Sequence, residues 1–140
     1  PEWVNQRLKS IEVRKELTDE WNRSGVKQGK EYAILTNEIT KAWAGMTVGE
    51  YKILKNLKNE NLRDNMTNIE LVLNMLAEAS TSEISKQENP KGFEKSKNIA
   101  RRGGKVAGAA RQELENQTGK SAISSSNAST PQELETGNRG

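Results

Sequence analysis

Apolar residues recur every three or four positions along much of the chain, which is the spacing of amphipathic helices. The first such segment covers residues 3–23 and stops at Ser24 and Gly25. On a helical wheel it carries two apolar stripes, which lie roughly 120° apart. The first stripe consists of Val4, Leu8 and Ile11, and the second consists of Val13, Leu17 and Trp21.

A helix with two apolar stripes contacts two different neighbours. We therefore expect the second stripe to pack on the core of its own domain. The first stripe, together with Trp3 at the start of the chain, is expected to face an upstream domain or a second copy. The alternative is a slightly curved helix that covers one core with both stripes.

Three further helices are marked by their ends. Residues 31–45 read as a helix that is closed by Gly45. The segments 46–51 and 66–71 share one pattern of helix start, in which a threonine caps the helix and a glutamate three positions later reaches back to it. These pairs are Thr47 with Glu50 and Thr67 with Glu70. Residues 59–65 form the connection between the two helices.

The helix that begins at Thr67 has apolar residues over more than half of its circumference, so the sequence predicts that it is the central core helix. Its apolar residues are Ile69, Val72, Leu73, Met75, Leu76 and Ala79. A thin polar stripe remains, formed by Glu70, Asn74 and Glu78. The helix either ends near Ser80 or continues to about Lys86. Trp21 and Trp43 lie on apolar helix faces and are expected in the core.

Residues 98–114 contain two adjacent glycines within a strongly helix-forming sequence. Two glycines inside one helix cost about 2 kcal/mol relative to alanine. Close approach by another helix would offset that cost, because a strip poor in side chains lets the two backbones come together. The strip consists of Gly103, Ala107 and Ala110. The alternative is a kink or break at Gly103 and Gly104, which would leave two short helices.

The last residues have a different composition, rich in Ser, Asn, Thr and Gly. We therefore predict a helical domain over residues 1–117 and a flexible, disordered tail over residues 118–140. Residues 130–135 carry a capping box but are too few to hold a helix alone in water. No segment alternates in the manner of a strand. The fold class expected for the domain is all-α, a bundle of about five helices with a long N-terminal helix.

Composition narrows the chemistry. The 140 residues include no cysteine and no histidine, which removes thiolate ligands, cysteine nucleophiles and the commonest general base. The carboxylates are scattered, and we find no catalytic constellation, no metal site and no motif for a cofactor. We therefore expect a chain that is not an enzyme and has no cofactor. No apolar run is long enough to span a bilayer, so we expect a cytoplasmic protein without membrane contact.

The formal net charge is only +3, but positive charge is concentrated between residues 95 and 111, around and within the glycine-containing helix. The basic residues are Lys95, Lys97, Arg101, Arg102, Lys105 and Arg111. Lys97, Arg101 and Lys105 follow one another at steps of four, so they line one helix face over about 12 Å. Such a face can bind the phosphates of nucleic acid without reading sequence. The competing interpretation is an ordinary solvated surface.

A resemblance to a known family runs through three long segments. They are "EYAILTNEITKAW", "KNENLRDNMTNIELVLNMLAEASTSEISKQ" and "GGKVAGAARQELENQTGK". Together they resemble the C-terminal half of DNA-damage-inducible protein D and of related phage or prophage antirepressor-like proteins, over about residues 3–127. Members of that family usually carry an N-terminal BRO-type domain before this half. A first residue other than Met agrees with excision from such a longer protein.

The resemblance implies a bacterial or phage protein of the SOS response or of lysogeny control that acts on DNA–protein complexes, such as recombinase filaments or repressors. It implies no enzymatic activity and assigns no catalytic residue. Our leading hypothesis is a protein-interaction module that forms homo-oligomers through its first helix, with Trp3, Val4, Leu8 and Ile11 at the interface. The alternative hypothesis is a nucleic-acid-binding helical domain that uses the basic face, with DNA as its partner.

Overall fold

The structure is a computed structural model that describes residues 1–126, apart from the side chain of Trp3. Five α-helices follow one another in this part of the chain, and it contains no strand. They are α1 (Glu2–Arg23), α2 (Lys30–Ala44), α3 (Val48–Leu54), α4 (Asn68–Glu88) and α5 (Phe93–Thr118). A 3₁₀ turn, η1, covers Arg63–Asn65. The all-α prediction is confirmed, whereas the segment 130–135 lies outside the described residues.

The helix ends follow the local signals in the sequence. Thr47 and Thr67 each accept a hydrogen bond from the backbone N–H of the glutamate three positions on, and that glutamate accepts one from the threonine N–H. Both predicted capping boxes are therefore confirmed. α2 ends at Gly45, whose positive φ of 77° is the left-handed conformation that glycine adopts most readily. α4 continues to Glu88, in agreement with the longer of the two predicted ends.

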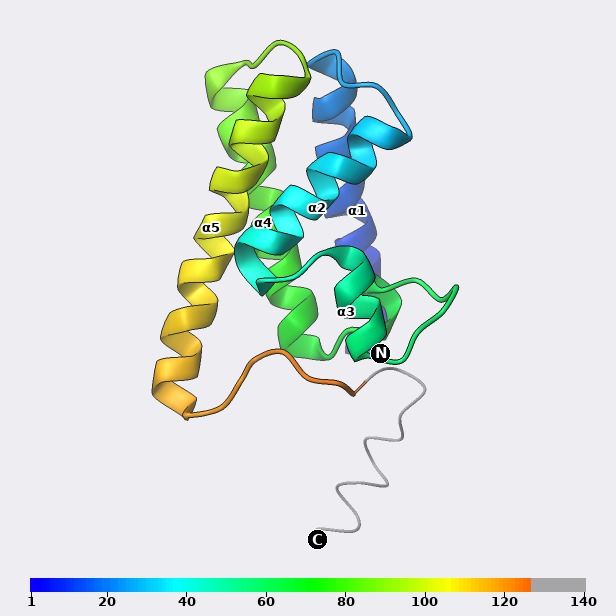
Figure 1. Ribbon diagram of the computed structural model, residues 1–140, viewed down its shortest axis with the longest axis vertical. Helices are drawn as coiled ribbons and strands as arrows, with labels where there is room; N and C mark the ends of the chain where they lie inside the picture. Colours follow the sequence, from blue (N-terminus) through cyan, green and yellow to red (C-terminus); the bar gives the residue numbers. More distant parts are fainter. Residues whose placement is uncertain (127–140) are drawn as a thin grey trace, which may run out of the picture.

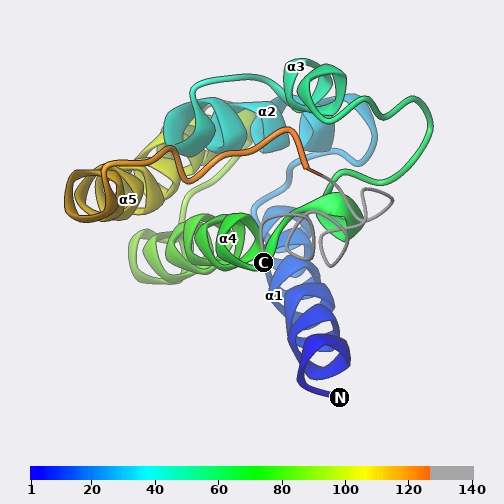
Figure 2. The same ribbon diagram turned by 90° about the horizontal axis from the view of Figure 1, so that it is seen from below.

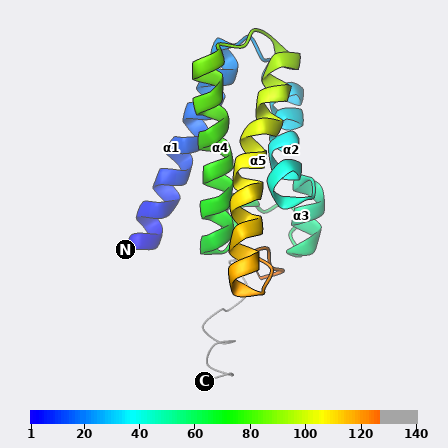
Figure 3. The ribbon, with the colours of Figure 1, turned by 90° about the vertical axis from the view of Figure 1, so that its left-hand side faces the viewer.

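The helices form two layers. Figure 2 shows α2 with α3 in one layer and α4 with α1 in the other, and α5 packs against both α2 and α4. α1 and α4 begin at the same end of the bundle and run in the same direction (Figure 1). The N-terminal half of α1 diverges from the other helices (Figures 2 and 3).

The core lies between the two layers and is centred on the aromatic residues. Trp21 and Trp43 are both almost fully buried, as predicted. The ring of Trp21 meets that of Tyr32 edge to face, with 5.2 Å between the ring centroids. The other large apolar side chains of the core that are fully enclosed are Leu17, Leu35, Ile39, Tyr51 and Leu71.

α5 passes through its glycines as one continuous helix. A Cβ atom added to Gly103 would lie 2.6 Å from the Cα of Thr81, so α4 and α5 can approach this closely only without a side chain there. Gly104 likewise allows α5 to approach α2 closely, because a Cβ atom added to it would lie 2.6 Å from the carbonyl oxygen of Ile39. Ala107 is fully buried and Ala110 is partly buried on the same helix.

The prediction for α4 was wrong in its orientation. The polar stripe of Glu70, Asn74 and Glu78 is buried, whereas Ile69, Val72 and Leu76 are exposed. Leu73 is the member of the predicted apolar set that is buried. The polar face of the helix points into the core because Glu70 and Glu78 pair there with cationic side chains from other elements. An ion pair of this kind cannot be seen from the periodicity of one segment.

The chain beyond α5 returns to the core instead of leaving it directly. Residues 120–126 belong to the predicted tail, but they cross the lower end of the bundle (Figure 1) and bury Ala122 and Ile123. Ala122 donates its backbone N–H to Glu115 at 2.8 Å. Ser124 donates its backbone N–H to the Glu70 carboxylate at 3.3 Å. The remaining tail residues, 127–140, lie outside the described part of the chain.

Candidate interaction surfaces

The first stripe of α1 is open to solvent. Leu8 is 54% exposed and Ile11 is 59% exposed, while Val4 is partly buried. Leu17 and Trp21, from the second stripe, are buried in the core. The helix therefore presents one apolar stripe to its own domain and another to the outside. Trp3 lies in the same helix, and its side chain falls outside what the structure describes.

The inward side of this half of α1 is polar. Arg7 donates to the backbone carbonyls of Arg63 and Met66, at 2.7 and 3.0 Å. Ser10 is fully buried and accepts a hydrogen bond from Arg63 at 2.8 Å. Arg14 donates to Glu78 at 3.1 Å and also contacts Thr36. These hydrogen bonds hold the polar side of α1 against η1 and α4, so the apolar stripe is left on the outside.

Glu78 is the centre of this polar network. Its carboxylate is buried and accepts two hydrogen bonds from the guanidinium of Arg63, at 2.9 and 2.6 Å. It also accepts the hydrogen bond from Arg14. Burial lowers the pKa of Arg14, and Glu78 acts against that shift. Because Arg14 comes from α1 and Arg63 from η1, the single carboxylate on α4 determines which face α1 and α4 turn toward each other.

A second buried ion pair lies at the lower end of the bundle. Lys55 and Glu70 are both fully enclosed, with 2.6 Å between Nζ and the nearer carboxylate oxygen. The hydroxyl of Tyr51 donates to the same carboxylate, and burial together with that contact raises the pKa of Tyr51 far above its ordinary value. Lys55 also donates to the backbone carbonyls of Ser124 and Ser126. This cluster joins α3, α4 and the segment that follows α5.

Most of the predicted basic residues contact carboxylates. Arg101 and Lys97 lie 3.1 and 3.8 Å from Glu38 of α2, and the hydrogen bond from Arg101 is the main reason for the lowered pKa of that carboxyl. Arg102 pairs with Glu88 at the end of α4. Lys95 and Lys105 have no carboxylate within 4.0 Å among residues 1–126. The six basic residues thus meet three carboxylates, those of Glu38, Glu88 and Glu115, so about half of their charge is balanced at close range.

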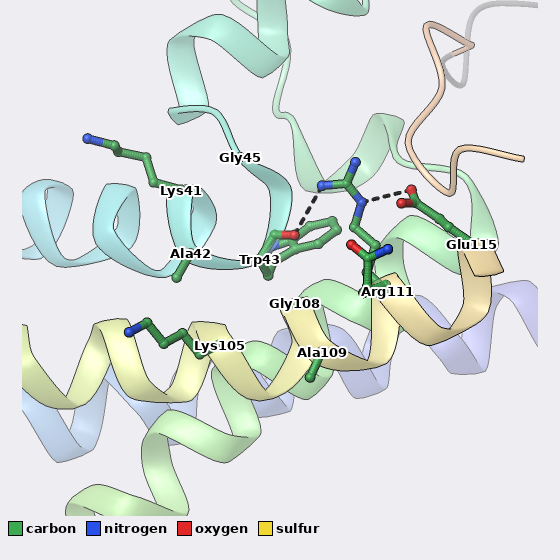
Figure 4. Close-up of a pocket in the computed structure, with 10 residues that line it drawn as sticks. Lys41, Ala42, Trp43, Gly45, Lys105, Gly108, Ala109, Arg111 and Glu115 are labelled. Atoms are coloured by element: carbon green, nitrogen blue, oxygen red, sulfur yellow. Dashed lines mark hydrogen bonds and ion pairs between the residues drawn. The ribbon is translucent and has the colours of Figure 1, made fainter.

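Arg111 lines a groove between α2 and α5, where its side chain contacts other parts of the protein (Figure 4). Its Nη1 donates to the carbonyl of Trp43 at 3.3 Å, and its Nε donates to Glu115 at 2.9 Å. The backbone N–H of Ala122 and then Arg111 lower the pKa of Glu115. The groove encloses about 390 Å³, and Lys41 and Lys105 lie on its two sides.

The prediction from sequence was wrong or incomplete for three features of these surfaces. It placed Ile69, Val72 and Leu76 in the core, although they form an exposed surface. It did not single out Lys55 or the partners of Glu78. The signal for the buried pairs was weak, since each requires residues that lie far apart in the chain.

Neither a metal site nor a membrane span is found in the part of the chain that the structure describes. No group of three acidic, histidine or cysteine side chains lies close enough together to hold a metal ion there. None of the five helices combines the length and the apolar character needed to cross a bilayer.

Comparison with known proteins identifies a family. The family model described as the DinD C-terminal domain matches residues 4–136. No curated protein and no solved structure matches the chain.

Proposed function

The chain belongs to the DinD C-terminal domain family, and on this basis we propose that it is a protein-interaction module that associates with further copies of itself through α1. The family points to the DNA damage response. The observation that carries the proposal is the exposure of Leu8 and Ile11 on a helix whose other apolar stripe is packed in the core. Exposed apolar residues in a regular stripe are typical of a surface that a partner covers.

Val4, Leu8 and Ile11 follow one another at steps of four and three residues. Lys15 stands four residues further on, on the same face of the helix. That is the spacing of a seam between two helices. Fully burying one large aliphatic side chain contributes about 1.5–3 kcal/mol. Leu8 and Ile11 are each a little over half exposed, so together they can contribute about 1.5–3 kcal/mol to a contact.

The family supports a proposal for the wider role. We propose that the module brings a damage-inducible protein to DNA–protein complexes in the bacterial cytoplasm, with a recombinase-type or repressor-type protein as its partner. Binding is proposed in preference to catalysis because the sequence offers neither histidine nor cysteine.

Direct binding of DNA is the second candidate. Lys41 and Lys105 favour it, because they flank one groove and have no carboxylate within 4.0 Å among the described residues. The ion pairs of Arg101 and Arg102 weigh against it, since both guanidiniums already have carboxylate partners. Phosphate binding would have to compete with those partners.

Sedimentation velocity over a range of protein concentrations tests the proposal. The unaltered chain is expected to form species larger than the monomer as its concentration rises. The double variant Leu8→Glu/Ile11→Glu is expected to weaken this association at least about a hundredfold, because it replaces two apolar contacts by charges that would be buried.

The matched control is Asn5→Glu/Lys9→Gln, which changes the net charge of α1 by the same amount at exposed positions outside the stripe. It should associate like the unaltered chain. Circular dichroism of each variant checks that the helices are retained. A chain that stays monomeric at every concentration, or a stripe variant that associates normally, would remove self-association through α1.

A further inference from the structure

We infer that the apolar stripe of α1 docks on the outer face of α4 and α5 of the next copy. This inference rests on the proposed self-association and names the surface that receives the stripe. Val72 and Leu76 of α4 are 46% and 37% exposed, and Val106 of α5 is 44% exposed. Leu76 and Val106 line an apolar groove of about 390 Å³, and Val72 lies one turn before Leu76 on the same face of α4. The lining residues of the groove are Leu76, Ala79, Ser80, Glu83, Ile84 and Val106.

This face cannot turn inward. The carboxylates of Glu70 and Glu78 are buried on the opposite side of α4, where each is paired with a cationic side chain. Rotating the helix to bury Val72 and Leu76 would bring both carboxylates to the surface and leave Lys55 in the interior without Glu70. The outer stripe of α4 therefore stays uncovered by residues 1–126.

The two exposed stripes match in spacing. On α1 the positions are Val4, Leu8, Ile11 and Lys15, and on α4 they are Val72, Leu76, Ala79 and Glu83. Both sets advance by four, three and four residues. With the two helices parallel and in this register, Leu8 lies against Leu76, and the larger Ile11 lies against the smaller Ala79.

The charges at the ends of the stripes are complementary. In the same register Lys15 of one copy lies beside Glu83 of the next. Glu83 is exposed and has no ion pair within 4.0 Å among the described residues. Lys15 contacts Asp19 at 3.0 Å, but both side chains are largely exposed, so this pair is weak and can exchange. An antiparallel register would separate Lys15 from Glu83.

The arrangement of the helices permits the parallel register. Figure 3 shows α1 and α4 beginning at the same end of the bundle, with α1 at its edge. A second copy that is shifted sideways without being turned over therefore presents its α1 parallel to α4. Such a contact joins two different surfaces, so it produces a ring or an open chain of copies.

Mixing two variants tests this inference. Leu8→Glu/Ile11→Glu removes the stripe and leaves the groove, whereas Leu76→Glu/Val106→Glu removes the groove and leaves the stripe. Each variant alone is expected to be a monomer. An equimolar mixture is expected to form a heterodimer that does not grow further, because only one stripe and one groove remain intact.

The outcomes separate this inference from the proposal on which it rests. Groove variants that still associate like the unaltered chain would overturn the inference and leave self-association through α1 in place. A mixture of two folded monomers that forms no heterodimer would overturn it as well. A monomeric unaltered chain would remove both. The control Ala109→Glu/Gln112→Glu, which alters exposed positions of α5 outside the groove, should behave normally.

An exchange of charges tests the register. Lys15→Glu is expected to weaken the association about threefold or more, because two like charges then face each other. Lys15→Glu/Glu83→Lys should recover the affinity of the unaltered chain. If the second substitution gives no recovery, the parallel register is wrong.

Discussion

Replacing Lys55 by methionine is expected to lower the free energy of unfolding by about 3–5 kcal/mol, because the substitution leaves the Glu70 carboxylate charged and buried without its cation. Both side chains are fully enclosed. Two backbone carbonyls, those of Ser124 and Ser126, lose a donor in the same step. Urea denaturation followed by circular dichroism measures the change.

The pair can be tested as a unit. In Lys55→Met/Glu70→Gln the amide oxygen can still accept the capping hydrogen bond from Thr67 and the amide NH2 can donate to the Tyr51 hydroxyl, whereas the Ser124 N–H loses its acceptor; no buried charge remains. This double variant should therefore recover part of the lost stability. Lys58→Met removes an exposed lysine from the same region and should change stability by no more than about 0.5 kcal/mol. Equal losses at Lys55 and Lys58 would show that the buried pair does not form.

Replacing Glu78 by alanine is expected to lower the free energy of unfolding by about 3 kcal/mol. The value lies at the lower end of the range for broken buried pairs because Arg14 and Arg63 keep 28% and 18% of their side-chain surface exposed and can be partly hydrated. The loss should appear as a lower denaturation midpoint in urea.

Glu83→Ala is the matched control for Glu78, since it removes a carboxylate from an exposed position of the same helix. Measured at a protein concentration low enough to keep the chain monomeric, it should change stability by less than about 0.5 kcal/mol. A Glu78→Ala variant as stable as this control would contradict the polar network that orients α1 and α4.

Local chemistry made much of the fold predictable. The two capping boxes involve residues only three positions apart, so the sequence itself contains the complete interaction. The glycines of α5 were predictable for a related reason, because a conformational cost inside a helix calls for a close neighbour. The orientation of α4 could not be predicted in this way. The cations that pair with Glu78 come from other elements, with Arg14 64 residues and Arg63 15 residues away in the chain.

The candidate interface was predictable on one side alone. A helix with two apolar stripes has one stripe too many for a single core, and this pattern is enough to single out Leu8 and Ile11. The receiving surface was hidden because Val72 and Leu76 have the periodicity of core residues. Periodicity gives the face of a helix that is apolar, but the ion pairs of the interior decide which way that face turns.

In the proposed assembly, the buried ion pairs turn the apolar stripes of α1 and α4 outward, where further copies cover them. Because the chain has no cysteine, single cysteines report on it directly. Leu8→Cys and Val72→Cys, in dilute solution, should react with a thiol reagent at least about a hundredfold faster than Leu71→Cys, which replaces a fully buried residue. At high protein concentration both should become protected. Equal slow labelling of Val72→Cys and Leu71→Cys in dilute solution, or no protection on association, would contradict the account.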